Sequence, residues 1–176
     1  MRQETPVREA VDAQDPDSGC RVLRAPALHV VLYRPEIPAN TGNIARLCGA
    51  AELRLHLIHP LGFRVDDRHL RRAGLDYWSE VDVMHHESFD TFKQGLGQGT
   101  GRVIAFSAHG ARYYTEATVG RGDYLLFGPE SVGLPPKIRD TYPCHAVPIW
   151  GRVRSLNLST TVGIVAYHYL HRMGKF

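Results

Sequence analysis

The fold is decided by residues 28–60, LHVVLYRPEIPANTGNIARLCGAAELRLHLIHP. The first six of these residues form a short, β-rich apolar run, which predicts a strand. Residues 40–51 are helix-like, and residues 53–60 return to a strand-like pattern. A strand, a helix and a second strand in succession are typical of an α/β unit whose two strands are parallel.

The same alternation continues to the end of the chain. Further strands are expected at residues 81–86, 102–107, 123–128 and 145–150. Further helices are expected at residues 66–75, 87–96, 135–142 and 155–173. The sequence therefore predicts an α/β domain with a mainly parallel sheet.

The composition is that of a single globular domain. The chain has 176 residues, of which 43% are apolar and 22% are charged, and this excludes a disordered segment or a coiled coil. No apolar run approaches the roughly 18 residues of a membrane helix, so no membrane association is expected. Residues 1–27 are polar and lack the apolar core of a secretory signal. We expect them to form a flexible tail before one domain at residues 28–176.

Charge and cysteine content narrow the class of protein further. The tail holds four Arg and five acidic residues of the chain's 21 basic and 18 acidic ones, which leaves 17 basic and 13 acidic residues in the domain. This mild excess permits an RNA or nucleotide partner without demanding one. Cys20, Cys48 and Cys144 are widely spaced and form no disulfide pattern, so a reducing cytosol is the expected location.

Several common site patterns are not supported. The glycine-rich segment 95–101 lacks the G-x-G-x-x-G spacing and precedes a strand, whereas a dinucleotide loop follows one. His85 and His86 are adjacent, so in a strand they face opposite sides, and we expect no metal site there. No serine lies in a G-x-S-x-G context, which argues against a hydrolase elbow.

Three polar loops follow predicted strands, at residues 34–43, 128–135 and 151–159. In parallel α/β sheets, ligands bind in the loops at the carboxyl ends of strands. The first loop opens a helix with Asn40 as a capping residue, and Arg46 is the single cation in the apolar run that follows. Taken alone, Arg46 would be expected to extend from an amphipathic helix into solvent.

The second loop begins with Gly128, Pro129 and Glu130. Glycine lets backbone come close to a ligand, and proline stiffens the turn. A plain strand-to-helix turn, with Glu130 as a carboxylate at a helix N-terminus, fits the same residues equally well.

The third loop places Ser155, Asn157 and Ser159 ahead of the last predicted helix. A helix cap followed by a core helix is one interpretation. Three polar residues are nevertheless more than a cap needs, and this favours a binding loop.

Three segments carry a family resemblance: NTGNIARLC, LLFGPESVGLP and VPIWGRVRSLNLSTTVGIVAYH. In this order they resemble the three motifs of the SPOUT class of RNA methyltransferases. LYRPEIPANTGNIARLC together with GFRVDDRHLRRAGLDYW narrows the resemblance to the TrmL-type tRNA 2′-O-methyltransferases. The similarity runs from residue 28 to about residue 174.

The resemblance implies a parallel sheet with helices on both faces and a C-terminal deep trefoil knot, a feature that sequence pattern alone would not favour. It also implies a homodimer whose knotted loops bind S-adenosylmethionine. The residues that match the cofactor-binding motifs are Phe106, Gly128, Val147, Ile149, Ser155 and Leu156. Glycine turns and aliphatic side chains suit a flat, apolar adenine.

The resemblance also implies a catalytic set near the target ribose. Arg46 is the main candidate and Asn43 accompanies it; Glu130, Asn157 and Tyr167 follow, although Tyr167 fits a core position almost as well. A protonated guanidinium can bind the adjoining phosphate and stabilise developing alkoxide charge. A general-base role would require a neighbouring cation or burial to favour the neutral form.

RNA contacts are expected in the segment that precedes the third strand. Arg68, Arg71 and Arg72 form the densest cationic cluster near the expected site and are candidates for phosphate contacts. Tyr77 or Trp78 could stack on an unpaired base. As a bare charge run, the same segment would simply be a solvated helix face.

The predicted function is methyl transfer from S-adenosylmethionine to the ribose 2′-hydroxyl of the anticodon wobble nucleotide, cytidine or uridine, in tRNA. One alternative is an enzyme of the same class that acts on another RNA, such as rRNA. A second is a non-catalytic RNA-binding module of the same fold. The segment IWGRVR, which includes Trp150–Arg154, does not match the family pattern residue by residue.

Overall fold

The computed structural model describes residues 21–64, 78–96 and 101–176. The strands are β1 His29–Tyr33, β2 Arg54–Ile58, β3 Val83–His86, β4 Val103–Phe106, β5 Arg112–Tyr113, β6 Tyr124–Phe127 and β7 Cys144–Ala146. The α-helices are α1 Pro38–Ala51, α3 Phe89–Leu96, α4 Pro136–Arg139 and α5 Leu158–Arg172. Two 3₁₀ turns, η1 Trp78–Glu80 and η2 Tyr114–Glu116, complete the described elements.

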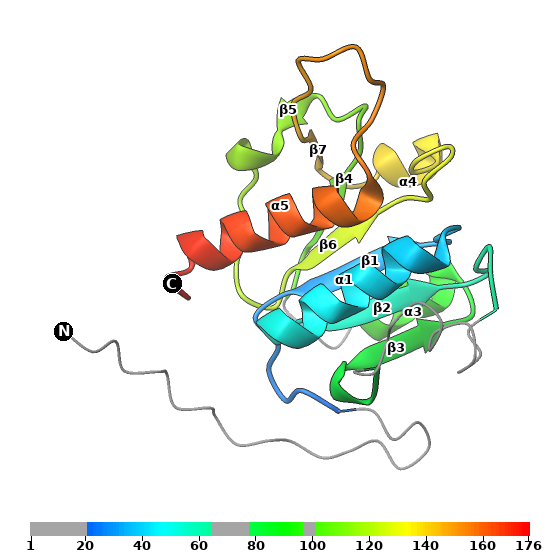
Figure 1. Cartoon of the computed structure of the whole chain (residues 1–176), viewed down its shortest axis with the longest axis vertical. Coiled ribbons are helices and arrows are strands. Elements are labelled where there is room, and N and C mark those ends of the chain that lie inside the picture. The colour runs from blue at the N-terminus through cyan, green and yellow to red at the C-terminus, as the bar shows by residue number, and fades with distance from the viewer. Residues whose placement is uncertain (1–20, 65–77, 97–100) are drawn as a thin grey trace.

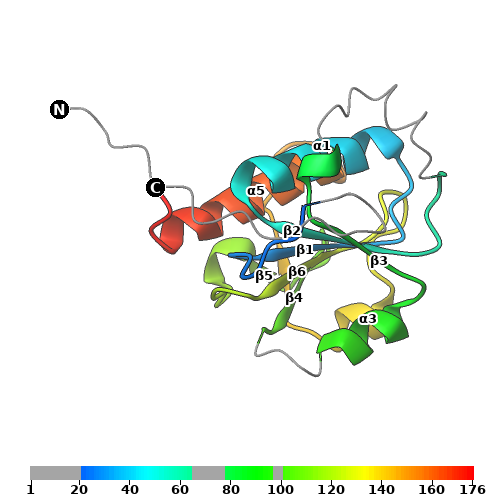
Figure 2. The ribbon, with the colours of Figure 1, turned by 90° about the horizontal axis from the view of Figure 1, so that it is seen from below.

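The strands form one seven-stranded sheet in the order β3-β2-β1-β6-β4-β7-β5 (Figure 1). Every strand pair in it is parallel. Helices α1 and α5 cover one face, and α3 and α4 cover the other (Figure 2). The prediction of a parallel α/β sheet with helices on both faces is confirmed.

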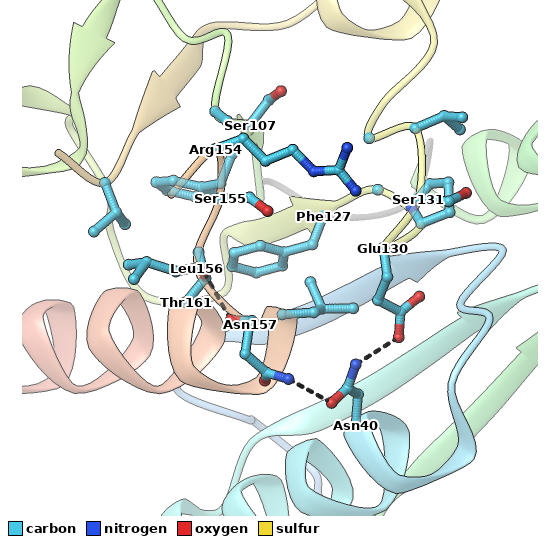
Figure 3. A pocket seen from close by; sticks show the side chains of 18 of the residues that line it. Asn40, Ser107, Phe127, Glu130, Ser131, Arg154, Ser155, Leu156, Asn157 and Thr161 are labelled. Carbon is cyan, nitrogen blue, oxygen red and sulfur yellow. Dashed lines mark hydrogen bonds between the residues drawn. The ribbon is translucent and has the colours of Figure 1, made fainter. Parts of the chain in front are cut away.

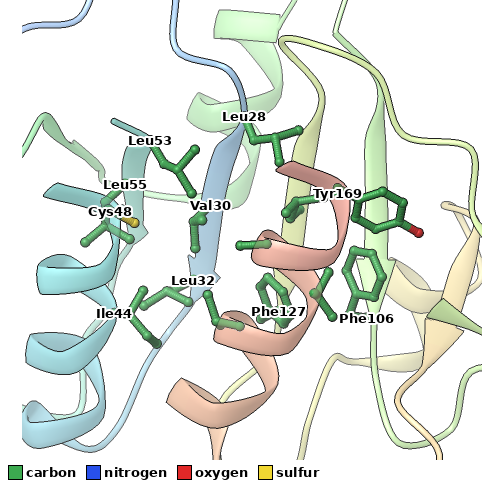
Figure 4. Close-up of a cluster of buried hydrophobic side chains, with 14 of the residues drawn as sticks. Leu28, Val30, Leu32, Ile44, Cys48, Leu53, Leu55, Phe106, Phe127 and Tyr169 are labelled. Carbon is green, nitrogen blue, oxygen red and sulfur yellow. The ribbon is translucent and has the colours of Figure 1, made fainter. Parts of the chain in front are cut away.

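The larger part of the core lies between the sheet and the pair α1 and α5. Alternate residues of the central strands, such as Val30 and Leu32, point to this face and are buried. Ile44 of α1 and Tyr169 of α5 close over them (Figure 4). Because a parallel sheet is covered on both faces, its strands are apolar along almost their whole length, as β1 and β6 are here.

The opposite face carries a row of hydrogen-bonded histidines as well as apolar side chains. Nδ1 of His29 lies 2.8 Å from Nε2 of His56, and Nδ1 of His56 lies 2.8 Å from Nε2 of His86. Tyr124 stacks on His29, and Phe92 of α3 packs edge-on against His56. A neutral imidazole has one donor and one acceptor, so a row of neutral rings satisfies each of these contacts.

Burial keeps these histidines neutral. Burial, helped by the nearby Arg54 guanidinium, lowers the pKa of His29 from 6.5 to about 4. Burial also lowers the pKa of His56, and the adjacent imidazoles act in the same direction. The pKa of His86 is lowered by burial and by His85.

The described part of the predicted tail packs against the domain. Leu23 is buried and donates its backbone N–H to the Asp82 carboxylate at 2.8 Å. Arg21 forms an ion pair with Glu52 at 3.1 Å, and Ala27 joins the core. The folded unit therefore extends at least to residue 21, whereas residues 1–20 lie outside the described chain.

Some element boundaries differ from the sequence prediction. Strand β5 was not predicted, because two exposed residues give no recognisable pattern. Strand β7 ends at Ala146, so most of the predicted strand 145–150 belongs to a loop. The helix predicted at 66–75 lies outside the described residues, and the glycine-rich segment 95–101 lies partly outside them.

Two further observations concern the described parts of the chain alone. None of the helices there combines the length and the apolar character that crossing a membrane requires. Within the same residues, no cluster of three or more His, Cys, Asp or Glu side chains could hold a metal ion. Both described cysteines, Cys48 and Cys144, are free thiols.

The histidine row predicts acid sensitivity. On unfolding, each of these imidazoles regains an ordinary pKa, so below about pH 6.5 the unfolded chain binds more protons than the folded one. Stability should therefore fall as the pH drops from 6.5 toward 4, by on the order of 2 kcal/mol between pH 7.5 and 5 for His29 alone. Urea unfolding at the two pH values measures this difference.

The matched variant is His29→Gln, which keeps a polar side chain but removes the titration. Its stability should depend less on pH than that of the wild type over the same interval. Equal pH dependence in the two proteins would contradict this role for His29.

Candidate functional site

A cavity of about 460 Å³ opens at the carboxyl ends of β4, β6 and β7, beside the start of α1 (Figure 3). Its walls come from four segments: the end of β4 and the loop after it, the loop after β6, the loop after β7, and the first turn of α1. This is the edge at which parallel α/β sheets bind ligands. The sequence analysis identified three of these loops but missed residues 107–109, which follow β4.

All six residues expected to bind a cofactor line this cavity. They are Phe106, Gly128, Val147, Ile149, Ser155 and Leu156. Phe106 stacks on Phe127, which also lines the cavity, with ring centroids 5.3 Å apart. The cavity therefore combines aromatic and aliphatic side chains with the main chain of two loops, a combination suited to a flat, largely apolar ligand.

Gly128 is required by the packing of the chain on itself. A Cβ at this position would lie 2.3 Å from the backbone nitrogen of Leu134 and 2.5 Å from the carbonyl carbon of Gly133. Gly133 itself has a φ of +68°, which favours glycine. The sequence analysis attributed Gly128 to close approach of a ligand; the structure shows that the loop folds back over it and so forms one wall of the cavity.

A chain of side-chain hydrogen bonds joins three segments at the cavity. The Asn40 amide donates to the Glu130 carboxylate at 2.9 Å, and the Asn157 amide donates to Oδ1 of Asn40 at 2.9 Å (Figure 3). The Asn157 oxygen then accepts the backbone N–H groups of Ser159 and Thr160 at the start of α5. Residues more than a hundred positions apart are thus connected through two amides.

The direction of donation along these hydrogen bonds is fixed by Glu130 at one end. The NH₂ group of the Asn40 amide must face the Glu130 carboxylate, because a carboxylate only accepts hydrogen bonds. The carbonyl oxygen of Asn40 therefore faces Asn157, which must donate to it. The oxygen of Asn157 is left to cap α5, so the orientation of each amide follows from the one before it.

Helix α1 begins at Pro38, with Ile37 as the N-cap residue and no side-chain cap of its own. The prediction that Asn40 caps this helix is wrong, because its side chain is engaged with Glu130 and Asn157. Glu130 instead accepts the backbone N–H groups of Glu36 at 2.8 Å and Ile37 at 3.2 Å. A carboxylate from the β6 loop thus lies at the positive end of the α1 dipole.

The first two loops are tied together a second time. The Glu36 carboxylate accepts hydrogen bonds from the backbone N–H of Ser131 at 2.9 Å and from its hydroxyl at 2.7 Å. The Glu130 carboxylate thus binds backbone N–H groups in the segment that contains Glu36, and the Glu36 carboxylate binds a backbone N–H in the loop that contains Glu130. This exchange holds the wall of the cavity formed by the β6 loop against the start of α1.

Other polar side chains also lie along the cavity wall. Ser107, His109, Arg154 and Thr161 line the cavity. Ser107 accepts a 3.3 Å hydrogen bond from the backbone of His109, and Thr161 donates to the Asn157 carbonyl at 3.0 Å. Ser107 and His109 follow the carboxyl end of β4, Arg154 lies in the loop between β7 and α5, and Thr161 lies in α5. These positions were the signal that could have identified them.

Three of the expected catalytic residues do not line the cavity. Asn43 and Arg46 occupy exposed positions of α1, and the expectation that Arg46 extends from an amphipathic helix into solvent is confirmed. Tyr167 of α5 is 44% exposed and packs against Phe176. Glu130 does line the cavity, but its carboxylate accepts three hydrogen bonds from the α1 segment.

The expected RNA-binding cluster Arg68, Arg71 and Arg72 lies outside the described residues, as does Tyr77. Trp78 is described and packs, partly buried, against the main core cluster. Its packing favours a structural role over base stacking.

Comparison with known proteins gives consistent matches. The model of the SpoU rRNA methylase family matches residues 27–167. A tRNA (cytidine(34)-2′-O)-methyltransferase of Saccharophagus degradans is 44% identical over 150 residues, which cover 83% of this chain and 96% of the relative. The enzyme of the same name from Escherichia coli is 42% identical, with 84% of this chain and 94% of the relative covered.

Solved structures are similar as well. One described as giving structural insights into the 2-OH methylation of C/U34 on tRNA is 51% identical, with a TM-score of 0.79 over 84% of this chain and 97% of the other. The SpoU methyltransferase AviRb of Streptomyces viridochromogenes, solved with AdoMet, has a TM-score of 0.72 at 22% identity. That match covers 92% of this chain and 63% of AviRb, and it shows similarity of fold.

The hydrogen-bond chain predicts a specific pattern for Asn157 variants. Asn157→Ala removes the α5 cap and the donor to Asn40, and should destabilise the protein by roughly 1–2 kcal/mol. Asn157→Asp keeps an acceptor for the cap but leaves Asn40 facing two carboxylates, so it should also destabilise. Urea unfolding at neutral pH measures both values.

The control is Ser88→Asp. Ser88 caps α3 by accepting the Thr91 N–H at 3.1 Å, outside the Glu130–Asn40–Asn157 chain. At that position aspartate should be neutral or slightly stabilising. If Asn157→Asp behaved like Ser88→Asp, Asn157 would be a cap and nothing more.

Proposed function

The chain belongs to the SpoU rRNA methylase family, and we propose that it transfers a methyl group from S-adenosylmethionine to the 2′-hydroxyl of the wobble nucleotide of tRNA. The observation that carries the proposal is the cavity, in which the six residues matching the cofactor motifs come together. The names of the relatives, which cover more than four-fifths of the chain, support cytidine or uridine in the anticodon over rRNA.

The cavity fits S-adenosylmethionine in size and chemistry. Its volume of about 460 Å³ lies within the usual range for small-ligand sites. Phe106, Val147, Ile149 and Leu156 offer apolar surface for adenine, while the main chain at Gly128 offers hydrogen-bonding groups for its edge. When bound, the cofactor supplies an activated methyl group on a sulfonium.

The protein must orient a ribose hydroxyl and assist the loss of its proton. A hydroxyl is a weak nucleophile, so alignment and stabilisation of the developing negative charge are the main contributions open to the protein. We assign this task to Arg46, with Asn43 beside it on α1 and Tyr167 on α5. Glu130, held by three hydrogen bonds, acts as a positioning residue that fixes the cavity against α1.

The active form is proposed to be a homodimer. Asn43, Arg46 and Tyr167 lie on exposed parts of α1 and α5, outside the cavity of their own chain. These two helices pack side by side, so their exposed faces form one surface of the molecule (Figure 1). A symmetric dimer formed through this surface would bring a second copy to the edge of the site and complete it.

The remaining features of the proposal concern tRNA and the chain's path. Arg68, Arg71 and Arg72 are proposed to contact phosphates of the anticodon stem-loop. A single-stranded loop is a suitable target because it exposes both base and 2′-hydroxyl.

The C-terminal segment is proposed to be threaded as a trefoil knot. This is supported by the way the chain leaves β7, crosses the cavity edge and returns as α5 beside α1. Free thiols at Cys48 and Cys144 support a cytoplasmic location.

One experiment tests the proposal as a whole. Purified protein is incubated with total tRNA and S-adenosylmethionine labelled in the methyl group, and the product is mapped by mass spectrometry. The proposal expects label on the ribose of the wobble nucleotide. Labelled rRNA with unlabelled tRNA, or cofactor binding with no transfer to any RNA, would overturn it.

For Arg46→Ala we expect the rate of methyl transfer to fall by roughly 100-fold or more, since a group that stabilises developing charge is lost. Affinity for S-adenosylmethionine should change little, because Arg46 does not line the cavity. Single-turnover assays and calorimetry measure the two quantities.

The matched control is Arg121→Ala. Arg121 is also exposed, but it lies in the turn before β6, at the opposite end of the sheet from the cavity. This variant should methylate normally. A loss of cofactor affinity in Arg46→Ala as large as its loss of activity would contradict the assigned role.

For the dimer we expect light scattering to give about twice the 19.7 kDa mass of one chain at micromolar concentration. Tyr167→Glu, which adds a charge to the exposed face of α5, should weaken the dimer. Arg121→Glu, a charge change elsewhere on the surface, should not. An active preparation that consists of monomers would contradict the dimer.

A further inference from the structure

The loop between β7 and α5 exposes a large aromatic side chain beside the cavity. Trp150 is 91% exposed and does not line the cavity, whereas Ile149 and Arg154 of the same loop do. Val153 in the same loop is 63% exposed. An indole gains much from burial, so an almost fully exposed one at the entrance of a binding site indicates a surface that is covered when a partner binds.

The charges around Trp150 indicate the chemistry of that partner. Residues 147–157 contain Arg152 and Arg154 and no acidic residue. Arg112 and the 57% exposed Tyr113 lie on β5, which pairs with β7 just before the loop begins. Figure 1 shows this loop rising from the edge of the sheet formed by β5 and β7.

Glu116 is an acidic residue near this edge, since η2, which contains it, directly follows β5 and contacts β7. Its carboxylate already accepts the backbone N–H of Tyr113 at 2.9 Å. The edge therefore presents cations and aromatic rings to solvent, and the Glu116 carboxylate is engaged locally. This combination is complementary to a polyanion that also has flat, exposed rings.

We infer that Trp150 stacks on an unpaired base of the substrate RNA, with Arg152 and Arg112 contacting the neighbouring phosphates. The inference rests on the proposed function and extends it, because it identifies an RNA contact surface made by the β7–α5 loop. Proteins that bind single-stranded nucleic acid combine a cationic surface with aromatic side chains on which bases stack. An exposed Trp in a loop that carries two Arg and no acidic residue, next to a strand with a third Arg, fits this pattern.

The position of Trp150 gives the contact a consequence for the reaction. Ile149, next to Trp150 in sequence, and Arg154, four residues further on, both line the cavity. A base held on Trp150 would therefore lie at the entrance, a short distance along the RNA strand from a nucleotide presented to the cofactor site. Stacking there would fix the strand without selecting a base, since every base has an aromatic face.

The test compares Trp150→Ala and Trp150→Phe with the wild-type protein, using an anticodon stem-loop RNA and calorimetry or fluorescence anisotropy. Trp150→Ala should bind the RNA about tenfold more weakly, whereas Trp150→Phe should keep most of the affinity. Binding of S-adenosylmethionine should be the same in all three proteins. Arg121→Ala is the control, because it removes an exposed side chain at the opposite end of the sheet from the cavity and should leave RNA affinity unchanged.

A second readout reports the stack directly. RNA should quench the tryptophan fluorescence of the wild type, and this quenching should largely disappear in Trp150→Phe even though that variant still binds. Unchanged RNA affinity in Trp150→Ala would overturn the inference. A change of oligomeric mass in Trp150→Ala would also overturn it, because the loop would then be a contact between copies of the chain.

Failure of this inference can be told apart from failure of the proposed function. If wild type and Trp150→Ala methylate tRNA and bind RNA equally well, the function stands and the stacking role does not. If the wild type transfers no methyl group to tRNA, the proposed function fails whatever the behaviour of Trp150.

Discussion

The hydrogen-bond chain from Glu130 through Asn40 to Asn157 is the constraint on which the site depends. It joins the β6 loop, the first turn of α1 and the start of α5, three segments that the fold brings together at one edge of the sheet. Asn40 is buried, and a buried amide left without partners costs about 1–3 kcal/mol. These hydrogen bonds therefore fix the three segments relative to one another, and with them the shape of the cavity.

The same arrangement explains why this edge is rich in polar residues that a simple cap or turn would not need. The Glu130 carboxylate accepts hydrogen bonds from backbone N–H groups at the start of α1, and the Glu36 carboxylate accepts one from the backbone N–H of Ser131 in the β6 loop. Gly128 lets that loop fold back on itself. The two carboxylates thus bind backbone N–H groups at the start of α1 and in the β6 loop, and the turn at Gly128 completes this wall of the cavity.

The succession of strands and helices along the chain could be predicted from the alternation of apolar runs, because the strands of a parallel sheet are buried on both faces and are therefore apolar along their length. The six cavity residues followed from motif resemblance. The partner of Asn40 could not be predicted, since a contact between positions 40, 130 and 157 depends on tertiary structure. Strand β5 is too short to give a pattern. The exposure of Arg46 was expected for a lone cation in an amphipathic helix, but its position outside the cavity depends on tertiary structure.

The candidate residues fall into two groups, one that lines the cavity and one that lies on the surface around it. The groups suited to hold a small, partly apolar ligand line the cavity, whose walls are joined by the hydrogen bonds among Glu130, Asn40 and Asn157. The cations and aromatic side chains suited to RNA, namely Arg46, Arg152 and Trp150, lie on exposed elements around it. Because phosphate contacts fix the position and orientation of a nucleic acid, an RNA strand that bridges these exposed groups would pass across the mouth of the cavity. On this arrangement, the rigid interior fixes where the methyl group is held, and the surface decides which ribose reaches it.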